Sequence, residues 1–139
     1  MDTVHGTTVA VNGIGILLRG RSGSGKSDLA LRLIDGGGVL IADDRCVLTA
    51  EDGAVVARAP AALRGQIEVR GLGIVTVPVL EQAALALVVD LDGDPPERLP
   101  EPETIELLGI AVRRLRLAAF DASTPAKIRL ALRAGEGER

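Results

Sequence analysis

Apolar and β-branched residues near the start of the chain fall into two short runs separated by a turn signal. The runs are 7–11 and 14–18, and each is long enough for one strand. Between them stands Asn12-Gly13, a dipeptide typical of a tight hairpin because both residues accept positive φ angles. The pattern predicts an antiparallel pair of strands here.

The next segment changes from strand periodicity to helix periodicity. Residues 27–34 place apolar side chains on one helical face, namely Leu29, Ala30, Leu33 and Ile34. The glycine triplet 36–38 ends this helix, and the apolar run 39–42 leads into Asp43-Asp44. Residues 14–44 are therefore predicted to form strand, glycine-rich loop, helix and strand.

The rest of the chain is predicted to be rich in strands. These strands are expected over 45–49, 54–58, 66–70, 73–79, 85–91 and, broken near Gly109, 105–117. Residues 92–103 are acidic and Pro-rich, which predicts a flexible loop. Thr124-Pro125 begins a helix over 126–132, and residues 135–139 are expected to be a frayed tail. The pattern as a whole predicts one α/β domain over 1–139, with a mixed β-sheet and few helices.

Composition narrows the chemistry that this domain can perform. The chain has 139 residues, 47% of them hydrophobic but only 1% aromatic, so the core must be aliphatic. An aromatic platform for single-stranded nucleic acid cannot be built, and a net charge of −3 disfavours nucleic acid as a partner. His5 and Cys46 are the only residues of their kinds, which excludes a disulfide and a conventional His/Cys metal site within the chain.

No segment predicts a membrane partner or a targeting signal. The longest apolar runs are far shorter than the roughly 20 residues that span a bilayer. Residues 1–8 lack a basic stretch followed by an apolar one. A cytoplasmic location is the expectation.

The strongest chemical signal is a glycine-rich loop that fits G-x-x-x-x-G-K-S. It consists of Gly20, Arg21, Ser22, Gly23, Ser24, Gly25, Lys26 and Ser27. Glycines let successive N–H groups turn toward an anion, and the following helix presents its positive end to phosphate oxygens. Lys26 would reach the β- and γ-phosphates and Ser27 would ligate Mg²⁺. Because the loop follows a predicted strand and begins a predicted helix, a nucleotide-phosphate site is favoured over a Gly- and Ser-rich surface loop.

Phosphate loops work with a carboxylate that holds the metal or its water, and two places in this chain qualify. Asp43-Asp44 follows the run 39–42, and Asp90 ends the strand 85–91 in the manner of an ordinary Walker B strand. Adjacent residues at a strand end point in different directions, so Asp43 and Asp44 could divide two roles, one toward metal and one toward an incoming hydroxyl. The alternative is a polar turn before the next strand.

Three further features have both a structural and a functional interpretation. His5 is by itself more typical of a surface or strand residue than of a catalytic one. Glu68 and Arg70 alternate with apolar residues. In the structural interpretation they form a salt pair on a half-exposed strand. In the functional one they supply metal and phosphate contacts at the strand end. The arginines of 113–116 are typical of a solvated edge, although arginine is also the preferred clamp for phosphate.

Taken together, these motifs resemble the catalytic domain of HPr kinase/phosphorylase. The resemblance covers residues 3–92 well and 105–134 loosely, and four segments carry it: Val4-His5-Gly6, the loop 20–27, the run 39–44 and Ile67-Glu68-Val69-Arg70-Gly71-Leu72-Gly73-Ile74. The phosphate loop alone is shared by very many families. Its coupling to the early Asp pair and to the last segment is much more specific.

The resemblance implies a fold, an activity and a role for each matched residue. The implied fold is the P-loop type related to phosphoenolpyruvate carboxykinase, often assembled as a hexamer. The implied reaction uses ATP and Mg²⁺ to phosphorylate a serine of HPr, a phosphocarrier protein, and in many members inorganic phosphate reverses it with release of pyrophosphate. The implied roles are base and acid for Asp43, placement of phosphate and aspartate for His5, phosphate binding for Lys26, and metal binding for Ser27, Asp44 and Glu68.

The sequence departs from that family in two places. Larger relatives carry an N-terminal domain, so a short form without it is expected. The later Arg/Pro/Gly-rich loop linked to phosphorolysis is not recognisable, and residues 116–125 stand in its place. The kinase reaction is therefore better supported than the phosphorylase reaction, and a nucleotide-sensing regulatory module without phosphotransfer is the alternative.

Overall fold

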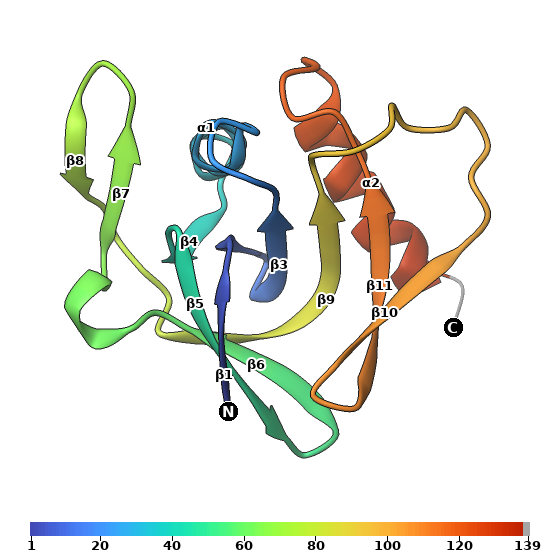
Figure 1. The fold of residues 1–139 in the computed structure, drawn as a ribbon, viewed down its shortest axis with the longest axis horizontal. Coiled ribbons are helices and arrows are strands. Elements are labelled where there is room, and N and C mark those ends of the chain that lie inside the picture. The colour runs from blue at the N-terminus through green and yellow to red at the C-terminus, as the bar shows by residue number, and fades with distance from the viewer. Residues whose placement is uncertain (138–139) are drawn as a thin grey trace.

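The computed structural model describes residues 1–137, which form a curled mixed sheet with helices on one side (Figure 1). The elements in chain order are β1 (Asp2–His5), β2 (Thr7–Val11), β3 (Ile14–Arg19), α1 (Lys26–Asp35), β4 (Val39–Ala42), β5 (Arg45–Glu51), β6 (Ala54–Arg58), a 3₁₀ turn (Ala61–Leu63), β7 (Gln66–Val69), β8 (Gly73–Thr76), β9 (Gln82–Asp90), β10 (Glu103–Leu107), β11 (Ile110–Arg116) and α2 (Thr124–Gly137). The expectation of a mixed sheet with few helices is confirmed.

The main sheet has the strand order β1-β5-β6-β9-β3-β2-β4, and β11 pairs with β9 and with β10. Strand β9 connects the two halves of this sheet. Its first residues pair with β6 in antiparallel fashion, and its last residues, from Leu87 to Asp90, lie parallel to both β3 and β11. The carboxyl ends of β3, β9 and β11 therefore meet at one edge, which is where ligands bind in sheets with parallel strands.

Alternate residues of the central strands feed two aliphatic clusters, one on each face of the sheet. On the α1 face, Val9, Ile16, Leu18, Leu87 and Val89 pack with Leu29, Leu33 and Ile128 of the helices. On the other face, Ala10, Leu17 and Val88 pack with residues of β5 and β6 such as Leu48 and Val55. Because both faces are covered, these strands read as continuous apolar runs in the sequence.

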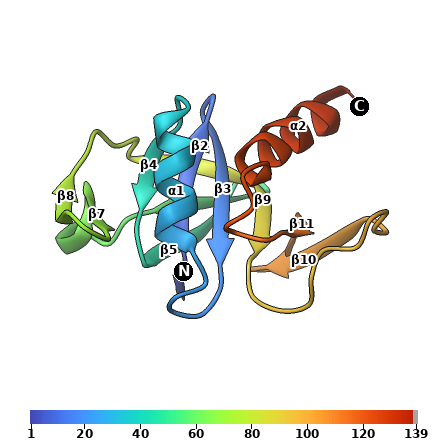
Figure 2. The ribbon, with the colours of Figure 1, turned by 90° about the horizontal axis from the view of Figure 1, so that it is seen from above.

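The helix α1 reverses the chain directly after β3. Figure 2 shows the connecting loop turning back at one end of the molecule, so that α1 runs along the sheet in the opposite direction to β3. Leu29, Ala30 and Leu33 are buried against the sheet, as the helical spacing predicts. Gly36 follows the helix, and its backbone N–H donates to the carbonyl oxygen of Arg32. The predicted end of the helix at the glycine triplet is confirmed.

A short hairpin formed by β7 and β8 lies apart from the main sheet, on the opposite side of α1 from β9 and α2 (Figure 1). Ile67 anchors it because its side chain is buried in the cluster beneath α1. The hairpin tip leaves Leu72 and Ile74 exposed. Strand β8 ends at Thr76, earlier than predicted, because Pro78 removes a ladder donor; Val79 instead bridges Leu40 of β4.

Both ends of the chain also differ from the sequence expectation. Residues 2–5 form β1, which pairs with β5, although no strand is predicted there. Helix α2 runs through Gly137, so residues 135–137 are helical where a frayed tail is expected; residues 138 and 139 lie outside the described residues. Over residues 1–137, neither helix is long and apolar enough to cross a membrane.

Candidate active site

The loop between β3 and α1 has the backbone that its glycines predict. Gly20, Gly23 and Gly25 all adopt positive φ angles, of 159°, 85° and 101°. Gly25 caps the helix in a left-handed conformation, and no side chain caps the first amides of α1. Since the first N–H groups of a helix have no partner within it, these amides remain available to an anion.

Lys26 is folded back over this loop. Its side chain is buried, and Nζ donates hydrogen bonds to the carbonyl oxygens of Gly20, at 2.5 Å, and Arg21, at 3.1 Å. The backbone N–H of Arg21 donates to the carboxylate of Asp92 across 2.9 Å, which ties the loop to the end of β9. A single buried ammonium group thus lies where phosphate oxygens would meet the helix N-terminus.

One buried polar atom fits a bound phosphate. Within residues 1–137, Oγ of Ser24 is the buried side-chain oxygen or nitrogen without a hydrogen-bond partner. A Cβ on Gly20 would collide with this side chain, so the glycine is required for the loop to close over Ser24. An orphaned hydroxyl, helix amides and a lysine are the donor set that a triphosphate accepts from.

Asp43 connects the phosphate loop with the strands beside it. Its Oδ1 accepts hydrogen bonds from the hydroxyls of Ser27, at 2.8 Å, and Thr7, at 3.0 Å. Its Oδ2 accepts from the backbone N–H of Glu68, at 3.0 Å. The carboxylate is nearly buried, and donors from three separate segments of the chain set its orientation.

Asp44 points elsewhere and pairs with the only histidine. Its φ angle is 69°, in the left-handed region that few non-glycine residues adopt and that aspartate tolerates better than most. This turn carries its side chain away from Asp43, and Nε2 of His5 donates to its Oδ1 across 2.7 Å. Thr7 joins the two acids, because its hydroxyl also accepts from the backbone N–H of Asp44, at 3.2 Å.

Asp90, the alternative acidic residue, is used differently. Arg19 holds it with two hydrogen bonds, of 2.8 and 3.0 Å, and Arg114 donates to the same carboxylate. Burial alone disfavours the charged form, but the two guanidinium groups outweigh it and hold the pKa of Asp90 below its ordinary value. Asp90 therefore joins the ends of β3, β9 and β11 rather than facing Ser27.

The structure brings most of the predicted site residues together. Hydrogen bonds link Ser27 to Asp43 and His5 to Asp44, and Glu68 reaches Asp43 through its backbone while its side chain is exposed to solvent. The sequence did not indicate a role for Thr7, nor that Asp90 would be held by Arg19 and Arg114. The available signal was the pair of threonines, Thr7 and Thr8, that begins an apolar buried strand.

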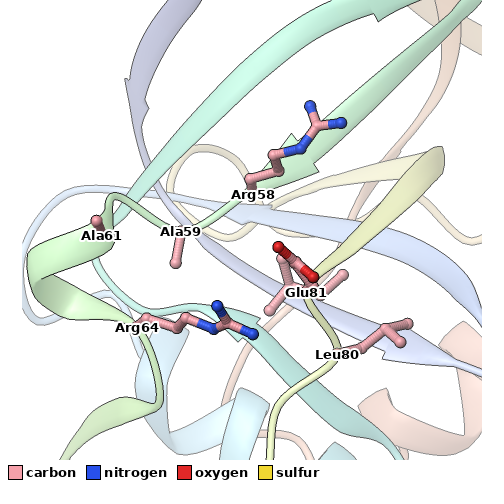
Figure 3. Close-up of a pocket in the computed structure, with 7 residues that line it drawn as sticks. Arg58, Ala59, Ala61, Arg64, Leu80 and Glu81 are labelled. Carbon is pink, nitrogen blue, oxygen red and sulfur yellow. The ribbon is translucent and has the colours of Figure 1, made fainter.

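A second concave feature lies away from this site. A pocket of about 270 Å³ lies at the end of β6. Figure 3 shows the charged side chains of Arg58, Arg64 and Glu81 around it. Ile41, Ala59, Ala61 and Leu80 complete its lining. None of the lining residues belongs to the phosphate loop or the Asp pair.

Comparison with known proteins shows the family of the chain. The family model of the HPr Serine kinase C-terminal domain matches residues 1–128. The chain belongs to this family. A solved structure, the Hpr(Ser) kinase/phosphatase from Coxiella burnetii, superposes with a TM-score of 0.84 at 27% identity, covering 99% of this chain and 98% of that one. The HPr kinase architecture is therefore the fold of the whole described chain.

Curated relatives support the same family. The HPr kinase/phosphorylases of Clostridium acetobutylicum and Clostridium beijerinckii are 38% identical over 126 residues and 39% identical over 124 residues. These matches cover 82% and 81% of this chain but 41% of each relative. The chain thus spans about two fifths of the length of these HPr kinase/phosphorylases.

Proposed function

We propose that this chain is a P-loop protein-serine kinase domain that uses ATP and Mg²⁺ to phosphorylate an HPr-type phosphocarrier protein. The observation that carries the proposal is the 2.8 Å hydrogen bond from Ser27 to Asp43. It joins the residue that ends the phosphate-binding motif to a nearly buried carboxylate. Family membership supports HPr as the class of acceptor, because the curated relatives are named HPr kinase/phosphorylase.

The residues of the loop bind the phosphates of the nucleotide. The amides of Gly23 and Gly25 and of the first turn of α1 surround the phosphate oxygens, and Ser24 gains an acceptor for its unpartnered hydroxyl. Lys26 exchanges the two loop carbonyls for phosphate oxygens of higher charge. The loop is already in shape, so binding needs little reorganisation of the backbone.

Asp43 is the base for the acceptor hydroxyl. As the serine oxygen attacks the γ-phosphorus, its proton passes to the Asp43 carboxylate, the bond from phosphorus to the bridging oxygen breaks, and ADP leaves. Thr7 and the Glu68 backbone hold the carboxylate in a fixed direction, which lowers the entropic cost of proton transfer. His5 and Asp44 lie beside it and would position the incoming phosphoryl group.

The same residues are suited to the reverse reaction. In that direction inorganic phosphate attacks phosphoserine, Asp43 returns the proton to the serine oxygen, and pyrophosphate is released. The phosphorylase part of the relatives' names supports this second activity. Homo-oligomers, hexamers by family resemblance, are also proposed, and sedimentation velocity on the purified chain tests them.

The site offers oxygen ligands of the kind that Mg²⁺ takes. The Ser27 hydroxyl and the Asp43 carboxylate are hydrogen-bonded to each other. Asp44 is the next residue in the chain, and Glu68 contacts Asp43 through its backbone N–H. Magnesium is usually held by one or two carboxylates together with phosphates and water. When bound, the ion would neutralise charge that develops on the phosphates.

Transfer of radiolabel from [γ-³²P]ATP to a purified HPr-type carrier tests the proposal. We expect Mg²⁺-dependent phosphoserine, identified by mass spectrometry, and a loss of about 10²–10⁴-fold in rate for Asp43→Asn. Asp52→Asn is the matched control, because Asp52 sits in the exposed β5–β6 turn with a positive φ that asparagine also accepts. ATP binding without labelling of the carrier would instead identify a nucleotide-sensing module.

A further inference from the structure

The chain contains one phenylalanine and no tyrosine or tryptophan, and the phenylalanine is not in the core. Phe120 is 67% exposed, in the connection between β11 and α2. Burial of a phenylalanine normally stabilises a fold, so leaving the only aromatic ring in water calls for a reason. Its surroundings supply one.

Phe120 lies against the phosphate loop. A Cβ placed on Gly25 would be 2.9 Å from Cζ of the phenyl ring and 2.6 Å from Cβ of Ala119. Gly25 is the residue that precedes Lys26 and caps α1. The far end of the ring therefore touches the backbone at the point where the loop presents its amides.

The segment that carries Phe120 is held in place. Arg32 of α1 donates to the carbonyl oxygens of Ala119 and Asp121, and the Thr124 hydroxyl donates to Ala118. The ring is thus an exposed group on a pinned turn, and its position is set by the same helix that follows the phosphate loop. These carbonyls are already used, so the surface this turn offers to a ligand is mainly the ring.

The strand order places Phe120 on the opposite side of the loop from the acids. The loop leaves β3; Asp43 and Asp44 follow β4, which lies beyond β2 on one side, while Phe120 follows β11, beyond β9 on the other. Phosphoryl transfer needs the γ-phosphate toward the acids, with the leaving diphosphate on the far side. The nucleoside attached to that diphosphate then extends toward Phe120.

We propose that Phe120 packs against the base of the nucleotide whose phosphates the loop binds. This inference rests on the proposed function and adds a base-contacting residue to it. Base–aromatic stacking tolerates any base, since every base has a π-face, so the ring favours nucleoside triphosphates over inorganic polyphosphates without selecting adenine from guanine. It would also explain why the ring remains at the surface.

Calorimetric titration with ATP, GTP and inorganic tripolyphosphate tests the inference. For Phe120→Ala we expect the Kd for ATP and for GTP to rise by similar factors, about 5- to 100-fold, while that for tripolyphosphate changes less than about twofold. Leu130→Ala is the matched control, because Leu130 is an exposed apolar residue on α2, and all three affinities should stay at the wild-type level. An equal weakening of ATP and tripolyphosphate would assign Phe120 to the shape of the loop and overturn the inference.

A second variant gives a direct optical signal. Phe120→Trp introduces the only tryptophan of the chain, so its emission reports on this position alone. Stacking predicts quenching by ATP but not by tripolyphosphate, with an ATP affinity close to that of the wild type. Unchanged emission in saturating ATP would contradict the contact.

The two proposals fail differently. If the wild-type chain binds neither ATP nor tripolyphosphate, the proposed function fails and this inference falls with it. If the wild type binds ATP and Phe120→Ala binds it equally well, only the inference about Phe120 is overturned. A raised KM for the carrier protein at unchanged ATP affinity would likewise overturn it, by placing Phe120 in the acceptor surface.

Discussion

The hydroxyl of Ser27 donates to Oδ1 of Asp43 across 2.8 Å, although the two residues stand on different elements, 16 positions apart. Ser27 lies in the first turn of α1, and Asp43 follows β4. The contact fixes the distance between the glycine-rich loop, which we propose binds phosphate, and the carboxylate that we propose accepts a proton. It is the geometric link on which a phosphotransfer mechanism depends.

Removal of the Ser27 hydroxyl should slow phosphorylation of the carrier and raise the Mg²⁺ concentration that the reaction needs. For Ser27→Ala we expect kcat/KM for carrier phosphorylation to fall at least about 10-fold, and the Mg²⁺ concentration for half-maximal rate to rise, because a hydroxyl ligand is lost. Initial rates over a Mg²⁺ titration measure both. Thr104→Ala, an exposed hydroxyl deletion on β10, is the control, and an unchanged Mg²⁺ requirement in Ser27→Ala would contradict the assignment.

Thr7 should act as a positioning residue rather than a catalytic one. Its buried hydroxyl bridges Asp43 and the backbone of Asp44, so Thr7→Val leaves both with an unmade hydrogen bond at nearly constant volume. We expect a loss of about 1–3 kcal/mol in unfolding free energy and a lower kcat at nearly unchanged KM for ATP.

Thr7→Ser is the matched rescue for that variant. It restores the hydroxyl and removes only a methyl group, so urea unfolding and kcat should return most of the way to the wild type. If Thr7→Ser is as impaired as Thr7→Val, the side chain matters through packing and the bridge does not orient the acids.

Lys26 should affect phosphate binding far more than folding. Its ammonium rests on loop carbonyls, and Lys26→Met keeps a long unbranched side chain there while removing the charge. We expect the Kd for ATP, measured by calorimetry, to rise by about 10-fold or more, with a change in melting temperature of a few degrees at most. ATP affinity at the wild-type level would remove Lys26 from the binding site.

The phosphate loop and the elements on either side of it follow directly from the sequence because their signals are local. Positive φ angles need glycine, a helix needs periodic apolar residues, and both occur within residues 14–44. Strand β1 could not be found this way. Its residues, Asp2 to His5, are mostly exposed and are held by pairing with β5, a contact between distant parts of the chain.

The site shows the same division between local and distant signals. Asp43 and Asp44 are recognisable because they end a strand just after the helix. The partners of Asp90 are not recognisable, since Arg19 and Arg114 reach it only when β3, β9 and β11 lie side by side. From the sequence alone, Asp90 is a candidate metal ligand because it ends a strand. In the structure it forms ion pairs with Arg19 and Arg114 instead.

Cys46 should be inert in the folded protein. Burial raises the pKa of its thiol, and Thr8 and Val47 surround it with hydrogen-bonding groups. Because the thiolate is the reactive form, labelling with a thiol-specific disulfide reagent at neutral pH should be at least about 100-fold slower than in urea-unfolded chain. Rapid labelling of the native protein would show that β5 opens locally.

Asp90 should contribute to stability in a pH-dependent way. Because its pKa lies below the ordinary value of 3.8, folding favours the charged form, and that contribution is complete above this pH. Asp90→Asn leaves Arg19 and Arg114 without their shared partner, and we expect a loss of roughly 2–4 kcal/mol in unfolding free energy at pH 7.

As pH falls below about 3.8 and through the lower folded-state pKa, the wild-type carboxylate is protonated too, so the difference between the two proteins should shrink. Urea unfolding of both proteins across this range measures it. Glu106→Gln, an exposed carboxylate on β10, is the control and should show little difference at any pH. A gap between wild type and Asp90→Asn that stays constant down to the lowest pH would mean that the charge of Asp90 does not hold these strand ends together.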